Sequence, residues 1–185
     1  MPTRLVQEFP DRDALEAVRA DLAVRVPATV ALGFIVLRGD VIGTISASGR
    51  MRRRTRAVAA GAGFATTAAT GQVDDASVFT AGDVLKNAAG TTIGTVAVGG
   101  VNTQTNMITL TGNAAVAVAA GAAVLGSDGS QVAQAISEDE TDGTAEAGIA
   151  AIISGLLVEA KLRGLDSTAK AELGGASVAG GTFKF

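Results

Sequence analysis

Arginine is the residue type whose spacing in this sequence most clearly indicates a binding function. Five arginines fall within seven positions: Arg50, Arg52, Arg53, Arg54 and Arg56. A guanidinium binds carboxylate or phosphate through paired N–H donors, so the run has three interpretations: a solvated strand edge, ion pairs with an acidic partner surface, or contact with nucleic acid. No aromatic side chains lie among the arginines to stack on bases, which disfavours the third. On a strand, successive side chains point to opposite faces, so the five charges cannot share one side.

Residues that form reactive centres are scarce. The chain has no His and no Cys, which removes the commonest general base, the main zinc ligands and thiolate chemistry. The one carboxylate group, Glu138, Asp139, Glu140 and Asp142, lacks an EF-hand pattern and is expected to be a solvated turn rather than a weak cation site. No phosphate-binding loop or nucleophile motif is found. We therefore predict no catalytic, cofactor or metal site, and a protein that is not an enzyme.

The composition favours thin layers or small barrels. The 185 residues are 48% hydrophobic but only 3% aromatic, with no Trp or Tyr, so large side chains that fill a thick core are few. The net charge of −3 is too balanced for a protein that coats nucleic acid. The uncharged run from Asn87 to Ser127 is broken by glycines, and we expect no membrane-spanning segment.

Periodicity predicts a mainly β chain with short helices near its two ends. Residues 1–27 are expected to form an N-terminal arm with a short helix that ends at Pro27, packed on its own domain or ordered by a partner. The Ala/Gly/Thr-rich residues 57–72 are expected to be a loop or linker. Strands are expected within 28–36, 41–45, 78–85, 92–98, 106–111, 122–125, 132–136, 148–158 and 182–185, and a helix capped by Asp166 within 165–175.

Three segments share their order and spacing with one known family. They are Val36–Arg50 (VLRGDVIGTISASGR), Ser127–Asp139 (SDGSQVAQAISED), and 150–173, where a hydrophobic strand precedes a short helix. Together they resemble the lambda-type head decoration family of tailed phages and cover a little under half of the chain. Each motif is low in complexity, so the order and spacing of the three carry the resemblance.

The resemblance implies a small β-barrel or β-tulip-like decoration domain with one or two short helices. It would comprise residues 28–56 and 127–185, with 57–126 as an inserted Gly/Ala/Thr-rich β unit and 1–27 as an arm. The implied function is structural: a capsid decoration, or cement, protein made in the host cytoplasm. It would bind the major capsid protein on the outer surface of the virion head and associate as trimers at three-fold and quasi-three-fold positions.

The residues expected to contact this partner lie in the arm and in the arginine run. In the arm they are Arg4, Leu5, Val6 and Phe9, and in the run they are the five arginines named above. No membrane and no nucleic acid is expected as a direct partner. The alternatives are another phage structural module, such as a tail-tube, fibre or baseplate accessory protein, or a surface binding domain, although the absence of Trp and Tyr disfavours a carbohydrate binder.

Overall fold

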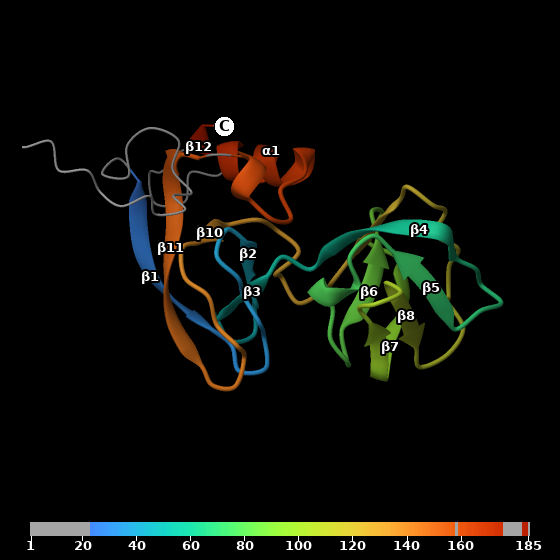
Figure 1. Cartoon of the computed structure of the whole chain (residues 1–185). Coiled ribbons are helices and arrows are strands. Elements are labelled where there is room, and N and C mark those ends of the chain that lie inside the picture. Colours follow the sequence, from blue (N-terminus) through green and yellow to red (C-terminus); the bar gives the residue numbers. More distant parts are fainter. Residues whose placement is uncertain (1–22, 158, 176–182, 185) are drawn as a thin grey trace, which may run out of the picture.

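The computed structural model describes residues 23–157, 159–175 and 183–184, and it contains two β-rich domains side by side (Figure 1). Strands account for 45% of the chain and helices for 9%, which confirms the predicted mainly β class. The first unit, called here the sheet domain, contains β1 (Val24–Val30), β2 (Val41–Thr44), β3 (Met51–Arg53), β10 (Ala135–Ser137), β11 (Ala147–Leu156), α1 (Ser167–Gly175) and β12 (Phe183–Lys184). The second, called the barrel domain, contains β4 (Arg56–Phe64), β5 (Thr70–Val73), β6 (Val84–Asn87), β7 (Thr92–Asn102), β8 (Met107–Leu110) and β9 (Ala123–Leu125).

The sheet domain is a strongly curved sheet. Its strand order is β1-β3-β2-β10-β11-β12, and β1 also pairs with β11, so the pairings return to the first strand. One side of the interior is filled by Val30, Val36, Ile42 and their neighbours, while α1 buries Leu173 against a second cluster. Asp166 caps α1 as predicted, because its Oδ1 accepts the N–H of Ala169 at 2.6 Å.

The barrel domain closes in the order β4-β5-β8-β7-β6-β9. Alternate residues of β8 point inward, and Ile108 and Leu110 are buried as their sequence alternation predicts. The one large aromatic on β4, Phe64, lies over Gly71 of β5, where a Cβ would collide with the ring. A barrel this small therefore fills its core mainly with Ala, Val, Ile and Leu side chains and with two phenyl rings, those of Phe64 and Phe79.

The expected loop at residues 57–72 is wrong, because 57–64 belong to β4 and 70–72 belong to β5, and only 65–69 form a connecting turn. Ala57 and Ala59 of β4 are 4% and 2% exposed and face the core of the barrel. Their small side chains allow close packing, but alanine carries no β preference, so the pattern is hidden in the sequence. Gly61 and Gly63 adopt positive φ angles of 54° and 66° where the register of β4 and β5 shifts. These glycines bend β4 around the barrel and do not interrupt it.

Two expectations for the start of the chain also need correction. Val24–Val30 is strand β1, so the predicted arm and helix do not extend to Pro27; residues 1–22 lie outside the described residues. Pro27 is exposed and pairs with Ala150 of β11, and it is tolerated because β1 contacts β3 only at Val30. Residues 31–36, predicted as strand, form a loop.

The barrel domain is inserted between β3 and β10, and the chain crosses between the domains at two adjacent points (Figure 1). The N–H of Gly126 donates to the carbonyl oxygen of Thr55 at 2.8 Å, which joins the outgoing and returning chains. The Thr55 hydroxyl also lies 2.8 Å from the Ser130 hydroxyl, and both residues are fully buried. The connection is therefore a hydrogen-bonded neck rather than two separate linkers.

Candidate functional site

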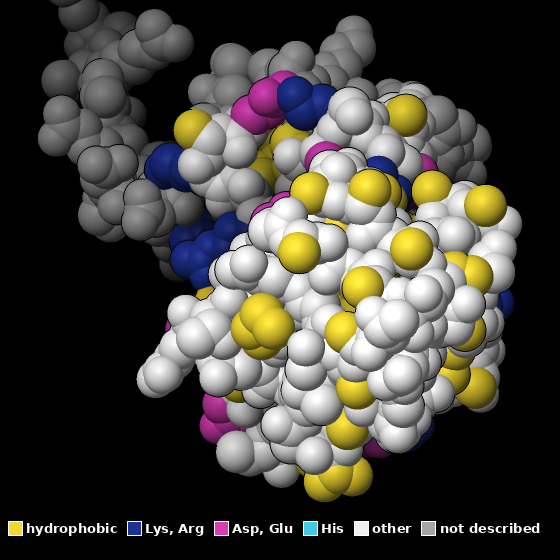
Figure 2. Space-filling view, turned by 90° about the vertical axis from the view of Figure 1, so that its right-hand side faces the viewer, with side chains coloured by type: hydrophobic (Ala, Val, Ile, Leu, Met, Phe, Trp, Pro, Cys, Tyr) yellow, Lys and Arg dark blue, Asp and Glu magenta, His cyan; other side chains and the backbone are white. Residues whose placement is uncertain are grey.

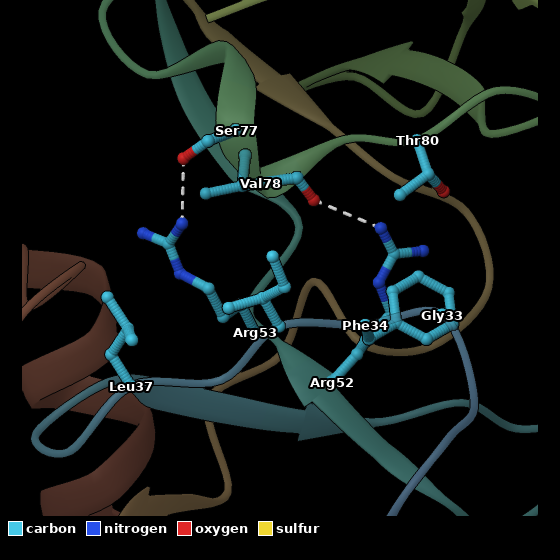
Figure 3. Close-up of a pocket in the computed structure, with 9 residues that line it drawn as sticks. Gly33, Phe34, Leu37, Arg52, Arg53, Ser77, Val78 and Thr80 are labelled. Atoms are coloured by element: carbon cyan, nitrogen blue, oxygen red, sulfur yellow. Dashed lines mark hydrogen bonds between the residues drawn. The ribbon is translucent and has the colours of Figure 1, made fainter. Parts of the chain in front are cut away.

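The arginine run lies on β3 and at the start of β4, where the sheet domain meets the barrel domain. The side chains of Arg52 and Arg53 leave β3 in opposite directions, as the strand geometry predicts, and pass on either side of Val78 in the barrel domain (Figure 3). Each arginine of the run pairs with a carboxylate of this same chain.

Arg52 is the most buried member of the run, with 2% of its surface exposed. Its two terminal nitrogens each lie 2.9 Å from an oxygen of Asp83, and Nη1 also lies 3.1 Å from Asp128. Nη2 donates to the carbonyl oxygen of Val78 at 3.0 Å. The guanidinium lies over the ring of Phe34, 4.1 Å from its centroid, in a cation–π contact. Arg52 of the sheet domain thus binds both the Asp83 carboxylate and the Val78 carbonyl of the barrel domain.

Arg53 forms the second link between the domains. Its Nε lies 3.2 Å from Asp40 of the sheet domain, its Nη2 3.0 Å from Asp75 of the barrel domain, and its Nη1 donates to Ser77 at 2.7 Å. Burial raises the pKa of Asp40 above its usual value, despite the nearby guanidinium. Burial would also raise the pKa of Asp75, but hydrogen bonds from Ser77 and the charge of Arg53 outweigh it and lower that pKa.

Arg54 and Arg56 bind the helix of the sheet domain. Arg54, 4% exposed, donates to Asp166 at 3.0 Å and to Glu172 at 2.9 Å, and Arg56 donates to the second oxygen of Asp166 at 2.7 Å. Burial opposes ionisation of Asp166, but the Ala169 N–H and the two guanidiniums together lower its pKa. Because Arg56 belongs to β4, this contact runs from the barrel domain back to the sheet domain.

The solvated interpretation of the run is wrong for Arg52 and Arg54, which are buried in ion pairs. No signal in the sequence indicates this pairing, because the acidic partners are scattered along the chain in loops and in α1; Arg54 and Glu172 are 118 positions apart. Arg50 differs, because its pair with Glu146 at 2.8 Å leaves both side chains more than 40% exposed. Contact of the run with a partner remains a prediction, and Arg4, Leu5, Val6 and Phe9 lie outside the described residues.

A cavity of about 280 Å³ lies between the domains beside Arg52 and Arg53. Its other walls come from the 33–37 loop and from Ser77, Val78 and Thr80 of the barrel domain (Figure 3). Both arginines that line it are already paired with carboxylates. Its apolar lining comes from Phe34, Ile35, Leu37 and Val78. This cavity therefore offers a small apolar recess at the junction rather than an assembled anion site.

The acidic residues 138–142 form contacts within the sheet domain. Glu138 pairs with Arg25 of β1 at 2.5 Å, and Asp139 accepts the N–H of Ala150 at 2.7 Å. Asp142 accepts the N–H of Thr144 at 2.9 Å, and this bond is the main cause of a lowered pKa for Asp142. Within residues 23–157, 159–175 and 183–184, no three acidic side chains are grouped to hold a metal ion.

Arg38-Gly39-Asp40 forms a turn, with Gly39 at a φ of 85°. Asp40 is 1% exposed, and its carboxylate accepts the N–H of Leu37 at 2.7 Å. The Asp40 carboxylate therefore stabilises this turn and is not accessible to a binding partner.

The lowered pKa of Asp166 predicts how the stability of the α1 contact depends on pH. A carboxyl whose folded pKa lies below its usual 3.8 stabilises the fold above that pH, and the contribution is lost as the pH falls through the lowered value. We expect the stability difference between wild type and Asp166→Asn to be largest near pH 6 and to shrink below about pH 4. Urea unfolding followed by circular dichroism across this range measures the difference.

For Asp40→Asn we expect the stability difference to change with pH in the opposite direction. Because the folded pKa of Asp40 is raised above 3.8, its ionisation disfavours the fold as the pH rises through that region. The stability of wild type relative to Asp40→Asn should therefore fall as the pH rises above about 4. If both stability differences, wild type against Asp166→Asn and wild type against Asp40→Asn, changed with pH in the same direction, the opposite pKa shifts assigned to the two carboxyls would be wrong.

Comparison with known protein families, curated proteins and solved structures finds no match to this chain. In the part of the chain that the structure describes, no helix has the length and apolar character needed to cross a membrane.

Proposed function

We propose that this chain is a capsid decoration protein that binds the outer surface of a tailed-phage head and stabilises the expanded shell. The observation that carries the proposal is the location of the three segments that resemble the decoration family. They are separated in sequence, yet they supply β2, β10, β11 and α1 of a single domain. In that domain β2 pairs with β10 and β10 pairs with β11.

The remaining segment supports the same proposal. The barrel domain enters and leaves through one neck, so it is added to the sheet domain without dividing the strands that carry the resemblance. Its far end has few charged side chains (Figure 2), and none occurs between Asn87 and Leu125. Such a surface provides no electrostatic attraction for nucleic acid. The ion pairs at the junction hold the barrel domain in a fixed position relative to the sheet domain.

The mechanism proposed is cementing by mass action. A protein that binds only the assembled, expanded lattice lowers the free energy of that lattice, by about 2.7 kcal/mol per site at a free concentration one hundred times Kd. A protein that bridges several shell subunits adds a further gain through effective concentration. The major capsid protein is the proposed partner, trimers at three-fold and quasi-three-fold sites are the proposed arrangement, and no chemical step is involved.

Mixing the purified protein with undecorated expanded shells tests this function. We expect binding to saturate at a fixed number of copies per shell, and decorated shells to withstand higher temperature than bare ones. Unexpanded shells are the control and should bind few copies. Stacked rings formed by the protein without any shell would instead identify a tail-tube subunit, and failure to bind expanded shells would reject decoration.

A further inference from the structure

One loop of the sheet domain exposes two large aliphatic side chains to solvent. In the loop between β1 and β2, Leu32 is 60% exposed and Ile35 is 58% exposed. Isolated exposed aliphatic residues are common, but two in one short loop form the beginning of an apolar patch. If the loop is rigid, the exposure of these two aliphatic side chains needs an explanation.

Hydrogen bonds to the β10–β11 connection fix the loop. The N–H of Gly33 donates to the carbonyl oxygen of Gly143 at 2.9 Å, and Val36 and Thr141 exchange backbone hydrogen bonds of 3.3 and 2.7 Å. The Thr141 hydroxyl also donates to the carbonyl oxygen of Phe34 at 3.2 Å. Between the two exposed residues, the Phe34 ring lies against the buried guanidinium of Arg52 (Figure 3). The aliphatic side chains thus stand on a preorganised support, which reduces the entropy lost on binding.

A hollow of about 630 Å³ adjoins this loop and is also lined by the connection between β10 and β11. That connection lies at the end of the sheet domain opposite α1 (Figure 1). Its apolar wall is formed by Ile35, Leu37, Ala145 of the β10–β11 connection and Ala147 at the start of β11, and Glu140 and Asp142 stand at its margin. Both acids are exposed, and neither forms an ion pair with any residue that the structure describes. Elsewhere in this domain, Glu138, Glu146 and Asp166 all pair with arginines.

An aliphatic wall beside two carboxylates makes this hollow suited to binding a Lys or Arg side chain. The methylene stem of Lys or Arg packs on apolar surface while its charged end remains at the edge, within reach of carboxylates. The same face of a second copy is a poor occupant, because a two-fold contact would bring the acidic margins together. Charge complementarity therefore favours a different protein with a basic surface.

We propose that Leu32, Ile35 and the hollow form the face that docks on the shell, where it receives a Lys or Arg side chain of the major capsid protein beside an apolar patch. This inference rests on the proposed decoration function and assigns the contact to a particular surface. The aliphatic pair supplies the centre of the contact, and Glu140 and Asp142 supply its polar rim. The rim speeds encounter and makes the association sensitive to salt.

Binding of variants to undecorated expanded shells tests the face. We expect Ile35→Ser, and separately Leu32→Ser, to weaken binding about tenfold or more, as for central residues of an interface. The double variant Glu140→Gln/Asp142→Asn should bind more weakly at low salt and show a smaller loss of affinity as salt increases. The control is Val98→Ser, on the barrel domain, whose side chain is 96% exposed; it should bind like wild type.

The outcomes separate this inference from the function on which it rests. If wild type binds shells and the Ile35 and Glu140/Asp142 variants bind equally well, the docking face is wrong while decoration stands. If wild type binds no expanded shell, both are wrong. All the substituted side chains are exposed, so thermal unfolding midpoints close to that of wild type should verify that each variant is folded.

Discussion

Replacing Arg52 by methionine is expected to lower the free energy of unfolding by about 3–5 kcal/mol, the usual effect of removing one partner from a buried ion pair. Methionine retains much of the length and apolar volume of the arginine stem, so the change removes mainly the charge and its donors. Asp83, with 13% of its side chain exposed, loses two hydrogen bonds, and the Val78 carbonyl loses its donor. Asp128 is more exposed, at 28%, and recovers part of its solvation in water.

The same substitution should weaken the coupling between the domains. Arg52 extends from β3 to Asp83 and Val78 of the barrel domain and also binds Asp128 near the neck. Without it, Arg53 and Arg56 still connect the domains, but through more exposed side chains. We expect the barrel domain to reorient more freely. Calorimetric unfolding and NMR relaxation of barrel amides measure stability and reorientation separately.

Arg50→Met is the matched control, because it removes the same side chain two positions earlier. Its ion pair with Glu146 leaves the two side chains 41% and 45% exposed, so its loss should cost at most about 1 kcal/mol. A double-mutant cycle between Arg52 and Asp83 isolates the pair itself: the double variant should be more stable than the sum of the single effects predicts. Equal effects of Arg50→Met and Arg52→Met would show that the buried network does not couple the domains.

Elements with a clear period or a local cap were predictable from the sequence. The alternation of Ile108 and Leu110 with threonines identified β8, and Asp166 marked the start of α1. Both signals depend only on neighbours in the chain, where a strand repeats every two residues and a cap acts within three positions. The mainly β class followed from the same local patterns.

The ion pairs between the two domains were not predictable, because each arginine and its acidic partners are distant in sequence. Nothing local to Arg54 indicates that it will meet Glu172. Five arginines within seven positions look like a solvated strand edge until the fold brings acids from distant parts of the chain to them. β4 was missed for a different reason, since its inward-facing Ala57 and Ala59 lack the size and branching that mark a strand. In both cases tertiary packing determines the role of residues whose local preference is weak.

Gly43→Ala should cost about 3 kcal/mol or more, the upper part of the range for overpacking a well-packed site. Gly43 lies in the middle of β2, where a Cβ would lie 2.5 Å from the carbonyl oxygen of Val132 and closer still to that of Ser130. Real Cβ atoms essentially never approach another atom within 3.0 Å, so the backbone on one side must move. Neither carbonyl can withdraw as a flexible side chain would.

The segment around Ser130 has little freedom to yield to this collision. Ser130 is fully buried, its hydroxyl lies 2.8 Å from that of Thr55, and its carbonyl oxygen accepts the Thr55 N–H at 3.3 Å. A shift of Ser130 away from β2 would therefore disturb the neck, and the effect of the new methyl group should extend to the barrel domain. Urea unfolding followed by circular dichroism gives the loss of stability, and amide exchange at Thr55 and Gly126 reports the state of the neck.

Gly148→Ala is the control for this prediction, because Gly148 also lies within a strand of the sheet domain but a Cβ there meets nothing within 4 Å. Alanine in a strand interior is more favourable than glycine by roughly 0.5–1 kcal/mol, so this variant should be as stable as wild type or slightly more stable. Similar stability of the two alanine variants would mean that β2 and the 130–132 segment are not in close contact. Since β2 and β10 belong to the segments that resemble the decoration family, that result would also remove the packing on which the proposed function depends.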